Sequence, residues 1–285
     1  MAEKERARLS VSHREGREAM TRAGQRLQYR LVARNDEPDS PNPIHRDDYA
    51  RSLGYPGGLV AGVTLYAYAS DAAVRLMGGD WLEHGYGEIH FRAPVFDSEE
   101  LTVVAEPIDG DAWRVSLLCD GLRAEAVVGP YRESIREDGL ERSGGGEPQT
   151  LAKDVSLKGE LLRVPDEQSM DREGLDRFIA DSGLEGTPLA RELRSRGLIP
   201  PNVIAGAPFH LLWRNHLYAV VIHTSSATEW VGPARLGETL YTWGVVEDAF
   251  EKRGRFYITQ RVVTVDGAGN RVARMLHTGT YEPTP

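Results

Sequence analysis

A long apolar run in the first half of the chain predicts a buried helix. No residue from Ala61 to Ser70 is charged, and apolar side chains continue over the next helical turn. A helix that is apolar on every side is buried on every side. The stretch from Gly206 to Leu212 has the same character, and its Pro208 is compatible with a helix only in the first turn. We therefore expect two central helices, the second beginning close to Pro208.

Alternating apolar and polar residues follow each predicted helix and indicate antiparallel strands. The alternation is clearest at Trp113, Val115 and Leu117, and the Asp-Gly pair at 266–267 is typical of a hairpin turn. The strand-like segments span residues 87–96, 100–108, 112–121 and 122–129, and then 224–232, 238–250, 254–267 and 270–281. One helix followed by an antiparallel run therefore occurs twice.

The two halves also match in sequence, which indicates a duplicated unit. Three pairs of segments occur in the same order, namely 13–24 with 171–182, 59–68 with 203–212, and 91–106 with 230–245. The second pair aligns Gly62 with Gly206, and the third aligns Pro94 with Pro233. No single pair is convincing, but the ordered set supports duplication.

A charged, glycine-rich stretch separates the two halves and reads as a linker. We expect an N-terminal unit at 1–131, a linker at 132–154 and a C-terminal unit at 155–285. A buried helix wrapped by a curved antiparallel sheet is the hotdog arrangement. The predicted class is therefore α+β, a double hotdog whose two sheets join side by side as a pseudo-dimer.

Composition narrows the classes of function. The 285 residues carry a net charge of −9, which argues against nucleic acid or an anionic membrane surface as a partner. The single cysteine, Cys119, excludes an intrachain disulfide framework. No apolar run reaches the roughly 20 residues of a membrane span, and the first residues lack the apolar core of a signal peptide. We expect a cytoplasmic protein that binds neither nucleic acid nor membrane.

The loop before the first predicted helix, PDSPNPIHRDDYA at 38–50, has the character of a site. Its prolines at 38, 41 and 43 disfavour helix and hold the chain extended, so Asp39, Asn42 and His45 are presented in defined positions. An imidazole that titrates near pH 6.5 can give and take protons. Ordinary loops and caps also use these residue types.

The same loop carries a family resemblance. The stretch DSPNPIHRD at 39–47, followed by GYPGGLVAG at 54–62, resembles the signature of the MaoC-like, R-specific enoyl-CoA hydratases. It also resembles a subset of uncharacterised bacterial hotdog proteins with Ser-x-Asn-x-Ile-His-x-Asp followed by Gly-Gly-Leu-Val-x-Gly. The resemblance implies reversible addition of water to a trans-2-enoyl thioester, delivered by CoA or by an acyl-carrier protein. It implies no cofactor and no metal.

The resemblance also implies roles for named residues. His45 would exchange protons with water, Asn42 would anchor the loop or the water, and the Gly62 N–H at the helix start would polarise the thioester carbonyl. Two positions depart from the family pattern. Ser40 stands where the family has its aspartate, so Asp39, or less favourably Asp47, would have to assist. Ala61 replaces the histidine that precedes the helix glycine.

Further side chains are candidates for substrate binding. Tyr66 on the first helix and His210 on the second could line an acyl pocket, although core positions are the commoner reading for both. Ser40 and Arg46 lie in the motif, where Arg46 could meet the anionic part of CoA. His210 and His216 do not share a helix face, and no HExxH or CxxC accompanies them, so no metal site is predicted.

Two other functions stay open on the sequence. A hotdog thioesterase would use the same residues to direct water at the carbonyl carbon. The serine at the aspartate position is also compatible with a protein that binds acyl thioesters without turnover. In each case we expect either a monomeric pseudo-dimer or a homodimer of it.

Overall fold

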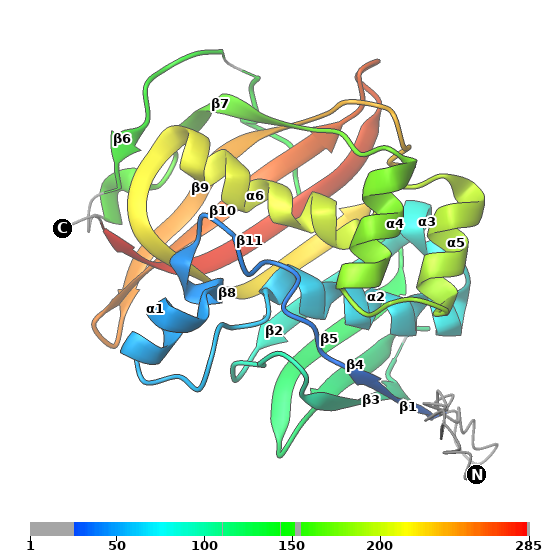
Figure 1. The fold of residues 1–285 in the computed structure, drawn as a ribbon. Helices are drawn as coiled ribbons and strands as arrows, with labels where there is room; N and C mark the ends of the chain where they lie inside the picture. Colours follow the sequence, from blue (N-terminus) through cyan, green and yellow to red (C-terminus); the bar gives the residue numbers. More distant parts are fainter. Residues whose placement is uncertain (1–25, 110, 143, 152–154, 284–285) are drawn as a thin grey trace, which may run out of the picture.

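The computed structural model describes residues 26–109, 111–142, 144–151 and 155–283, and one antiparallel sheet runs through both halves of the chain (Figure 1). The first half contributes β1 (Leu27–Val32), β2 (Gly85–Phe91), β3 (Glu100–Pro107), β4 (Trp113–Leu118) and β5 (Leu122–Pro130). The second half contributes β7 (Leu161–Gln168), β8 (His216–Trp230), β9 (Leu240–Lys252), β10 (Arg255–Val265) and β11 (Arg271–Pro283). The strand order is β1-β3-β4-β5-β2-β8-β11-β10-β9-β7, and β6 (Gln149–Thr150) pairs with β8 outside this path.

The pairing of β2 with β8 joins the two halves into one sheet. The two strands are antiparallel, with Tyr86 opposite Glu229 and His90 opposite Ser225. On either side of this junction the strands follow in matching order, since β5, β4, β3 and β1 correspond to β11, β10, β9 and β7. The predicted sequence of one helix followed by antiparallel strands, repeated once, is confirmed.

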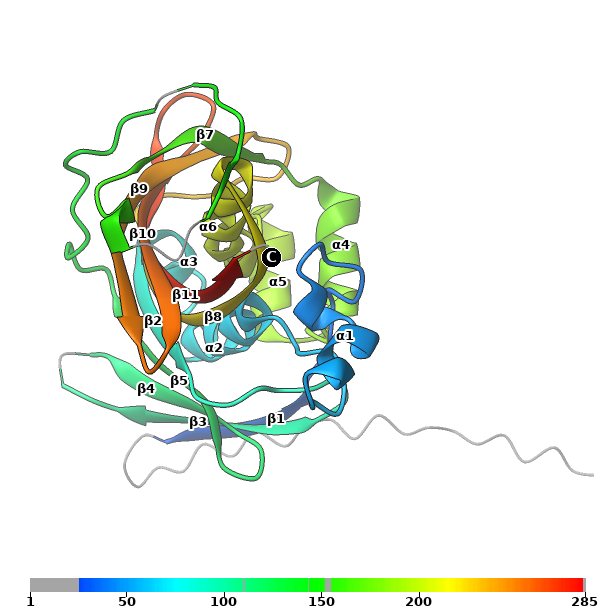
Figure 2. The same ribbon diagram turned by 90° about the vertical axis from the view of Figure 1, so that its left-hand side faces the viewer.

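Two long helices, α2 (Gly62–Met77) and α6 (Pro201–Asn215), lie inside the curve of the sheet, as Figure 2 shows. The shorter helices are α1 (Asp47–Ser52), α3 (Trp81–His84), α4 (Arg172–Asp181) and α5 (Pro188–Arg196), with 3-10 turns η1 (Pro43–His45) and η2 (Val155–Leu157). None of the helices in the described ranges is long and apolar enough to cross a bilayer.

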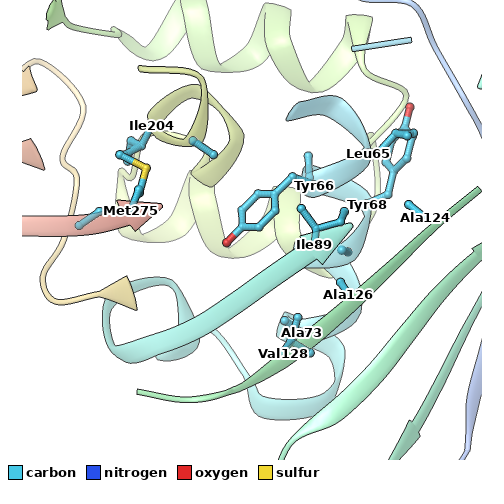
Figure 3. Packing of buried hydrophobic residues seen from close by; sticks show 14 of the residues in the cluster. Leu65, Tyr66, Tyr68, Ala73, Ile89, Ala124, Ala126, Val128, Ile204 and Met275 are labelled. Atoms are coloured by element: carbon cyan, nitrogen blue, oxygen red, sulfur yellow. The ribbon is translucent and has the colours of Figure 1, made fainter. Parts of the chain in front are cut away.

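Helix α2 is buried on all sides, as its pattern predicts. Every residue from Thr64 to Val74 is buried. In Figure 3 its side chains pack on Ile89 of β2 and on the alanines of β5, Ala124 and Ala126. Small residues on the facing strand let the helix approach the sheet closely, so the uncharged sequence is explained by packing.

The start of the second helix differs from the prediction. Helix α6 begins at Pro201, and Pro208 lies inside it. The proline pair at 200 and 201 explains the earlier start, because proline is favoured in the first helical position. Pro208 has no N–H for the carbonyl four residues earlier, so the interior of α6 lacks one helical hydrogen bond.

The alignment of Gly62 with Gly206 is therefore wrong by several residues. The Val60 N–H donates to Val95 O at 2.8 Å, and the Ile199 N–H makes the same 2.8 Å bond to Ala234 O. These matched bonds immediately precede the two helices. Gly62 thus corresponds to Pro201, the first residue of α6.

Several elements have no counterpart in the sequence analysis: β1, β7, the first half of β8, and helices α3, α4 and α5. Helices α4 and α5 have clear local signals. The Asp171 side chain accepts a hydrogen bond from Gly174 N at 2.8 Å, and Thr187 caps α5 just before Pro188. The segment 171–182 is thus a capped helix, while its matched segment 13–24 lies outside the described residues.

The chain between the halves packs on the second half of the sheet. Ser134 and Ile135 donate backbone hydrogen bonds to the buried carboxylate of Glu229. Arg261 donates to the carbonyls of Arg136 and Asp138 at 3.0 and 2.8 Å. This part of 132–154 is therefore held at defined points, and the domain boundaries at 131 and 154 stay a prediction.

Replacing Trp230 with alanine should strongly destabilise the junction. Trp230 is 1% exposed, and its ring centre lies 6.5 Å from that of Tyr66 and 6.3 Å from that of Trp81. We expect the free energy of unfolding in urea to fall by about 3–5 kcal/mol. Leu217→Ala on the same strand is the control, since Leu217 is 51% exposed, and should change it by less than about 0.5 kcal/mol. Equal losses in the two variants would contradict this account of the junction.

Candidate functional site

A cavity of about 420 Å³ lies where the motif loop, the start of α2 and the second half of the chain meet. Its walls come from both halves. From the first half it takes Ser40, Asn42, His45, Gly62 and Phe91, and from the second Phe209, His210, Trp213, His223 and Tyr257, among others. The duplicated fold thus builds one shared site, and the motif loop forms one side of it.

His45 enters the cavity with a defined tautomer. Its Nδ1 lies 2.7 Å from the carbonyl oxygen of Leu59. A carbonyl oxygen only accepts, so Nδ1 carries the proton of the neutral ring and Nε2 is left with its lone pair. Burial lowers the pKa of His45 below its usual value, which favours the neutral ring at neutral pH. Nε2 of the neutral His45 ring can therefore accept a proton.

The loop that carries His45 is fixed at both ends. Asn42 is buried, and its Nδ2 donates to Val221 O of β8 at 2.7 Å. Asn35 Nδ2 donates to the carbonyl of His45 at 2.8 Å. A Cβ on Gly58 would lie 2.0 Å from that same carbonyl oxygen, so this position accepts only glycine without displacing the loop. First-half residues thus hold His45 against a second-half strand.

The start of α2 opens onto the same cavity without a cap. Ala61 is the N-cap residue and has no side chain that could accept a hydrogen bond. Among the described residues nothing accepts from the N–H groups of Gly62 and Val63, and both residues line the cavity. Free N–H groups at the positive end of a helix favour an anionic or strongly polarised oxygen.

A histidine of the second half packs directly on Gly62. A Cβ at Gly62 would lie 2.8 Å from Nδ1 of His223, so glycine is required for the close approach of β8 to the start of α2. The ring of His223 stacks on that of His277 with 4.1 Å between ring centres. Burial and the neighbouring His277 hold the pKa of His223 well below its usual value, and burial lowers that of His277 to about 3. Both rings are therefore neutral.

Sequence reasoning missed this histidine pair. His223 immediately precedes one predicted strand, and His277 lies within another, but nothing in the sequence places the two side by side. The hydrogen-bonded register pairs His277 with Ser226 and Gly279 with His223, with a bulge between. Only the folded sheet brings the rings together.

The other predicted site residues are dispersed. Ser40 lines the cavity and accepts from Asn42 N at 3.3 Å. Asp39 is exposed and does not line it, and Arg46 is also exposed, 4.0 Å from Asp48. Tyr66 is fully buried against Trp230, away from the cavity wall.

His210 lines the cavity from α6, beside a buried carboxylate. Its Nδ1 lies 2.8 Å from Nε2 of Gln168 and 3.6 Å from Oδ2 of Asp166. Gln168 Nε2 also donates to Asp166 Oδ2 at 2.8 Å, and Arg214 donates to Asp166 Oδ1 at 3.0 Å. These contacts hold His210 at the cavity wall.

Carboxylates are scarce on the cavity wall. Within the described ranges, Glu37 is the one acidic residue that lines it. Burial raises the pKa of Glu37, with nearby Asp36 adding to the effect. Asp47 has a structural role, since its Oδ1 accepts from Gly58 N at 2.8 Å and its Oδ2 from Arg51 at 2.7 Å. The described residues contain no group of three or more His, Cys, Asp or Glu that could hold a metal ion.

The start of α6 does not repeat the arrangement at the start of α2. Pro201 occupies the place of Gly62 and has no N–H to donate. Helix α5 also covers the far part of α2, where Leu189 N donates to the buried Asp71 at 3.0 Å. The equivalent position in the second half therefore lacks the donor that Gly62 supplies.

Comparison with known proteins supports the fold. No protein-family model and no curated protein sequence matches the chain. A conserved hypothetical protein from Mycobacterium tuberculosis with a double hotdog fold is 12% identical, with a TM-score of 0.59 over 90% of this chain and 96% of that chain. A MaoC-like dehydratase is 14% identical, with a TM-score of 0.55 over 90% and 98%. A protein from Novosphingobium aromaticivorans assigned as a thioesterase is 14% identical, with a TM-score of 0.51 over 90% and 95%. The chain has the double hotdog fold, as its sequence predicts.

Proposed function

We propose that the protein is a hydratase/dehydratase of acyl thioesters, interconverting trans-2-enoyl and 3-hydroxyacyl groups carried by CoA or an acyl-carrier protein. One observation carries the proposal: a histidine with a free Nε2 and an uncapped helix start open onto the same cavity. The first supplies a base for water. The second supplies donors for the oxygen that becomes negative during the reaction.

The residues present account for each step of hydration. The thioester oxygen accepts from the Gly62 N–H, which draws electron density from C3. Water adds its oxygen to C3 while His45 Nε2 takes one of its protons, and charge moves to the thioester oxygen as an enolate. The protonated His45 then returns that proton to C2, which restores the neutral ring. Dehydration is the same path in reverse.

The cavity walls suit an acyl group. Val63, Leu65, Phe91 and Phe209 supply apolar surface to it. Arg92 and Arg255 also line the cavity, and both could meet the phosphates of a CoA or phosphopantetheine group. Arg46, which is exposed beside Asp48, lies in the neighbouring motif segment.

The resemblance of the motif and the likeness to a MaoC-like dehydratase both favour hydration. The family aspartate is absent, since Ser40 occupies its place and Asp39 lies off the cavity wall. The proposal includes a cytoplasmic location, no cofactor, and a chain that acts as a monomeric pseudo-dimer or as a homodimer of it.

Thioester hydrolysis is the second candidate, favoured by the absence of an aspartate from the cavity wall and by the likeness to an assigned thioesterase. Here His45 would direct water at the carbonyl carbon, and the thiolate would leave with the proton. Binding without turnover is the third candidate.

The test is incubation with crotonyl-CoA and a longer trans-2-enoyl-CoA, following enoyl absorbance and free thiol together. We expect loss of absorbance without thiol release, and a loss of turnover of at least about 100-fold in His45→Ala, because water loses its base. His90→Ala is the matched control, since His90 is bonded to Glu88 and lies outside the cavity. Thiol release would favour hydrolysis, and full turnover by a folded His45→Ala variant would exclude His45 as the base.

The pH dependence of turnover should report the buried His45. Only the neutral ring can accept a proton, so activity is complete above the pKa of His45 and falls as pH drops through it. Burial lowers that pKa below 6.5, so the acid limb of kcat/KM should be centred below pH 6.5, with activity rising to a plateau above it. An acid limb centred at or above pH 6.5 would contradict the assignment.

A further inference from the structure

The histidine pair of the second half leaves polar atoms buried without partners. None of the four ring nitrogens of His223 and His277 has a hydrogen-bond partner of normal geometry among the described residues, although the Ser225 backbone lies close enough to His223 to offset part of the lowering of its pKa. The Phe209 ring is nearly perpendicular to both, with its centre 5.2 Å from that of His223 and 4.3 Å from that of His277. A buried ring nitrogen without a hydrogen-bond partner is unfavourable, so the nitrogens of His223 are best explained by a ligand that binds from the cavity.

Only one ring of the pair reaches the proposed reaction site. His223 lines the cavity, whereas His277 lies behind it. Phe91 and Phe209 flank the His223 ring, with ring centres 4.6 and 5.2 Å from it. These contacts fix its position, so His223 is a rigid polar group in an otherwise apolar part of the wall.

His223 and His45 flank the segment that leads into α2. His45 bonds to Leu59 O on one side of this segment, and His223 contacts Gly62 at its end. The bond from Asn42 to Val221 O ties the His45 loop to the strand that carries His223, two residues away. Two imidazoles from different halves therefore lie at the same helix start.

We propose that His223 holds the reacting water together with His45, in the role that a carboxylate at the position of Ser40 would have. This inference rests on the proposed function. Water has two protons. One is transferred to Nε2 of His45, and the other stays on the water oxygen and forms a hydrogen bond to the unprotonated nitrogen of His223.

The step is balanced without any change at His223. The water oxygen bonds to C3, the transferred proton passes through His45 to C2, and the second proton stays on the new hydroxyl. His223 keeps its own proton throughout and acts by orienting the water. A neutral imidazole suits this role because it has one nitrogen that can accept.

The test is His223→Phe, which keeps an aromatic ring against Phe91 and Phe209 and removes both nitrogens. We expect kcat with crotonyl-CoA to fall about 100-fold, while KM changes less than about threefold because the acyl walls are intact. His277→Phe is the matched control, since it does not line the cavity, and should keep kcat within about threefold. His223→Gln retains an acceptor and should recover about tenfold in kcat over His223→Phe.

Glu37→Gln tests the alternative that Glu37, the acidic residue on the cavity wall, holds the water instead of His223. A folded His223→Phe variant with wild-type kcat, while His45→Ala is inactive, would overturn the inference and leave the proposed function standing. A loss of about 100-fold in Glu37→Gln alone would give the role to Glu37 instead.

A binding measurement separates the inference about His223 from the proposed hydratase function. Calorimetry in the His45→Ala background compares 3-hydroxybutyryl-CoA with butyryl-CoA, so turnover does not consume the ligand. We expect about tenfold tighter binding of the hydroxylated ligand, and no preference once His223→Phe is added. Equal affinities in His45→Ala would overturn the inference. If the wild-type protein hydrates neither enoyl thioester, the proposed function fails, and this preference still decides whether His223 holds a hydroxyl group.

Discussion

The antiparallel pairing of β2 with β8 is the contact on which the rest of the structure depends. It converts two short sheets into one and sets α2 and α6 side by side inside the curve. It also carries β8 past the start of α2, which puts His223 on Gly62 and gives Asn42 a carbonyl to bind. Without this junction neither half has a closed cavity, because each supplies only part of the wall.

Glycine at position 62 meets two demands at once. Its small size admits the His223 ring, and its N–H is one of the donors left free by an uncapped helix start. A capping serine or aspartate at Ala61 would stabilise the helix and compete for those donors. The uncapped start of α2 therefore lacks a stabilising cap at the position where the proposed function places a ligand oxygen, a trade-off that functional sites often show.

Much of the fold is predictable from the sequence, because burial leaves a strong pattern in it. The uncharged run of α2 and the alternation in β4 and β5 follow from which side chains face the core. The motif loop is also readable, since its prolines restrict the backbone near His45. The edge strands β1 and β7 and the true start of α6 are not readable in this way, because tertiary contacts and a proline pair decide them.

The candidate site is only half predictable, and for a physical reason. His45, Asn42, Ser40 and Gly62 lie within one stretch of sequence, so a local motif can identify them. His223 and His277 meet only through strand register across a bulge. Asp39, one residue before the position that the family spacing gives to Ser40, is exposed and lies off the cavity wall, whereas Ser40 lines it.

The proline that begins α6 makes the two halves of the duplicated fold unequal. Pro201 has no N–H to donate at the start of the second copy's helix, and α5 packs on the far part of α2. The second copy still supplies contacts that position the site, since Val221 O accepts from Asn42 and His223 packs on Gly62. Under the proposed function, such an asymmetric duplication implies one ligand per chain rather than two equivalent ones.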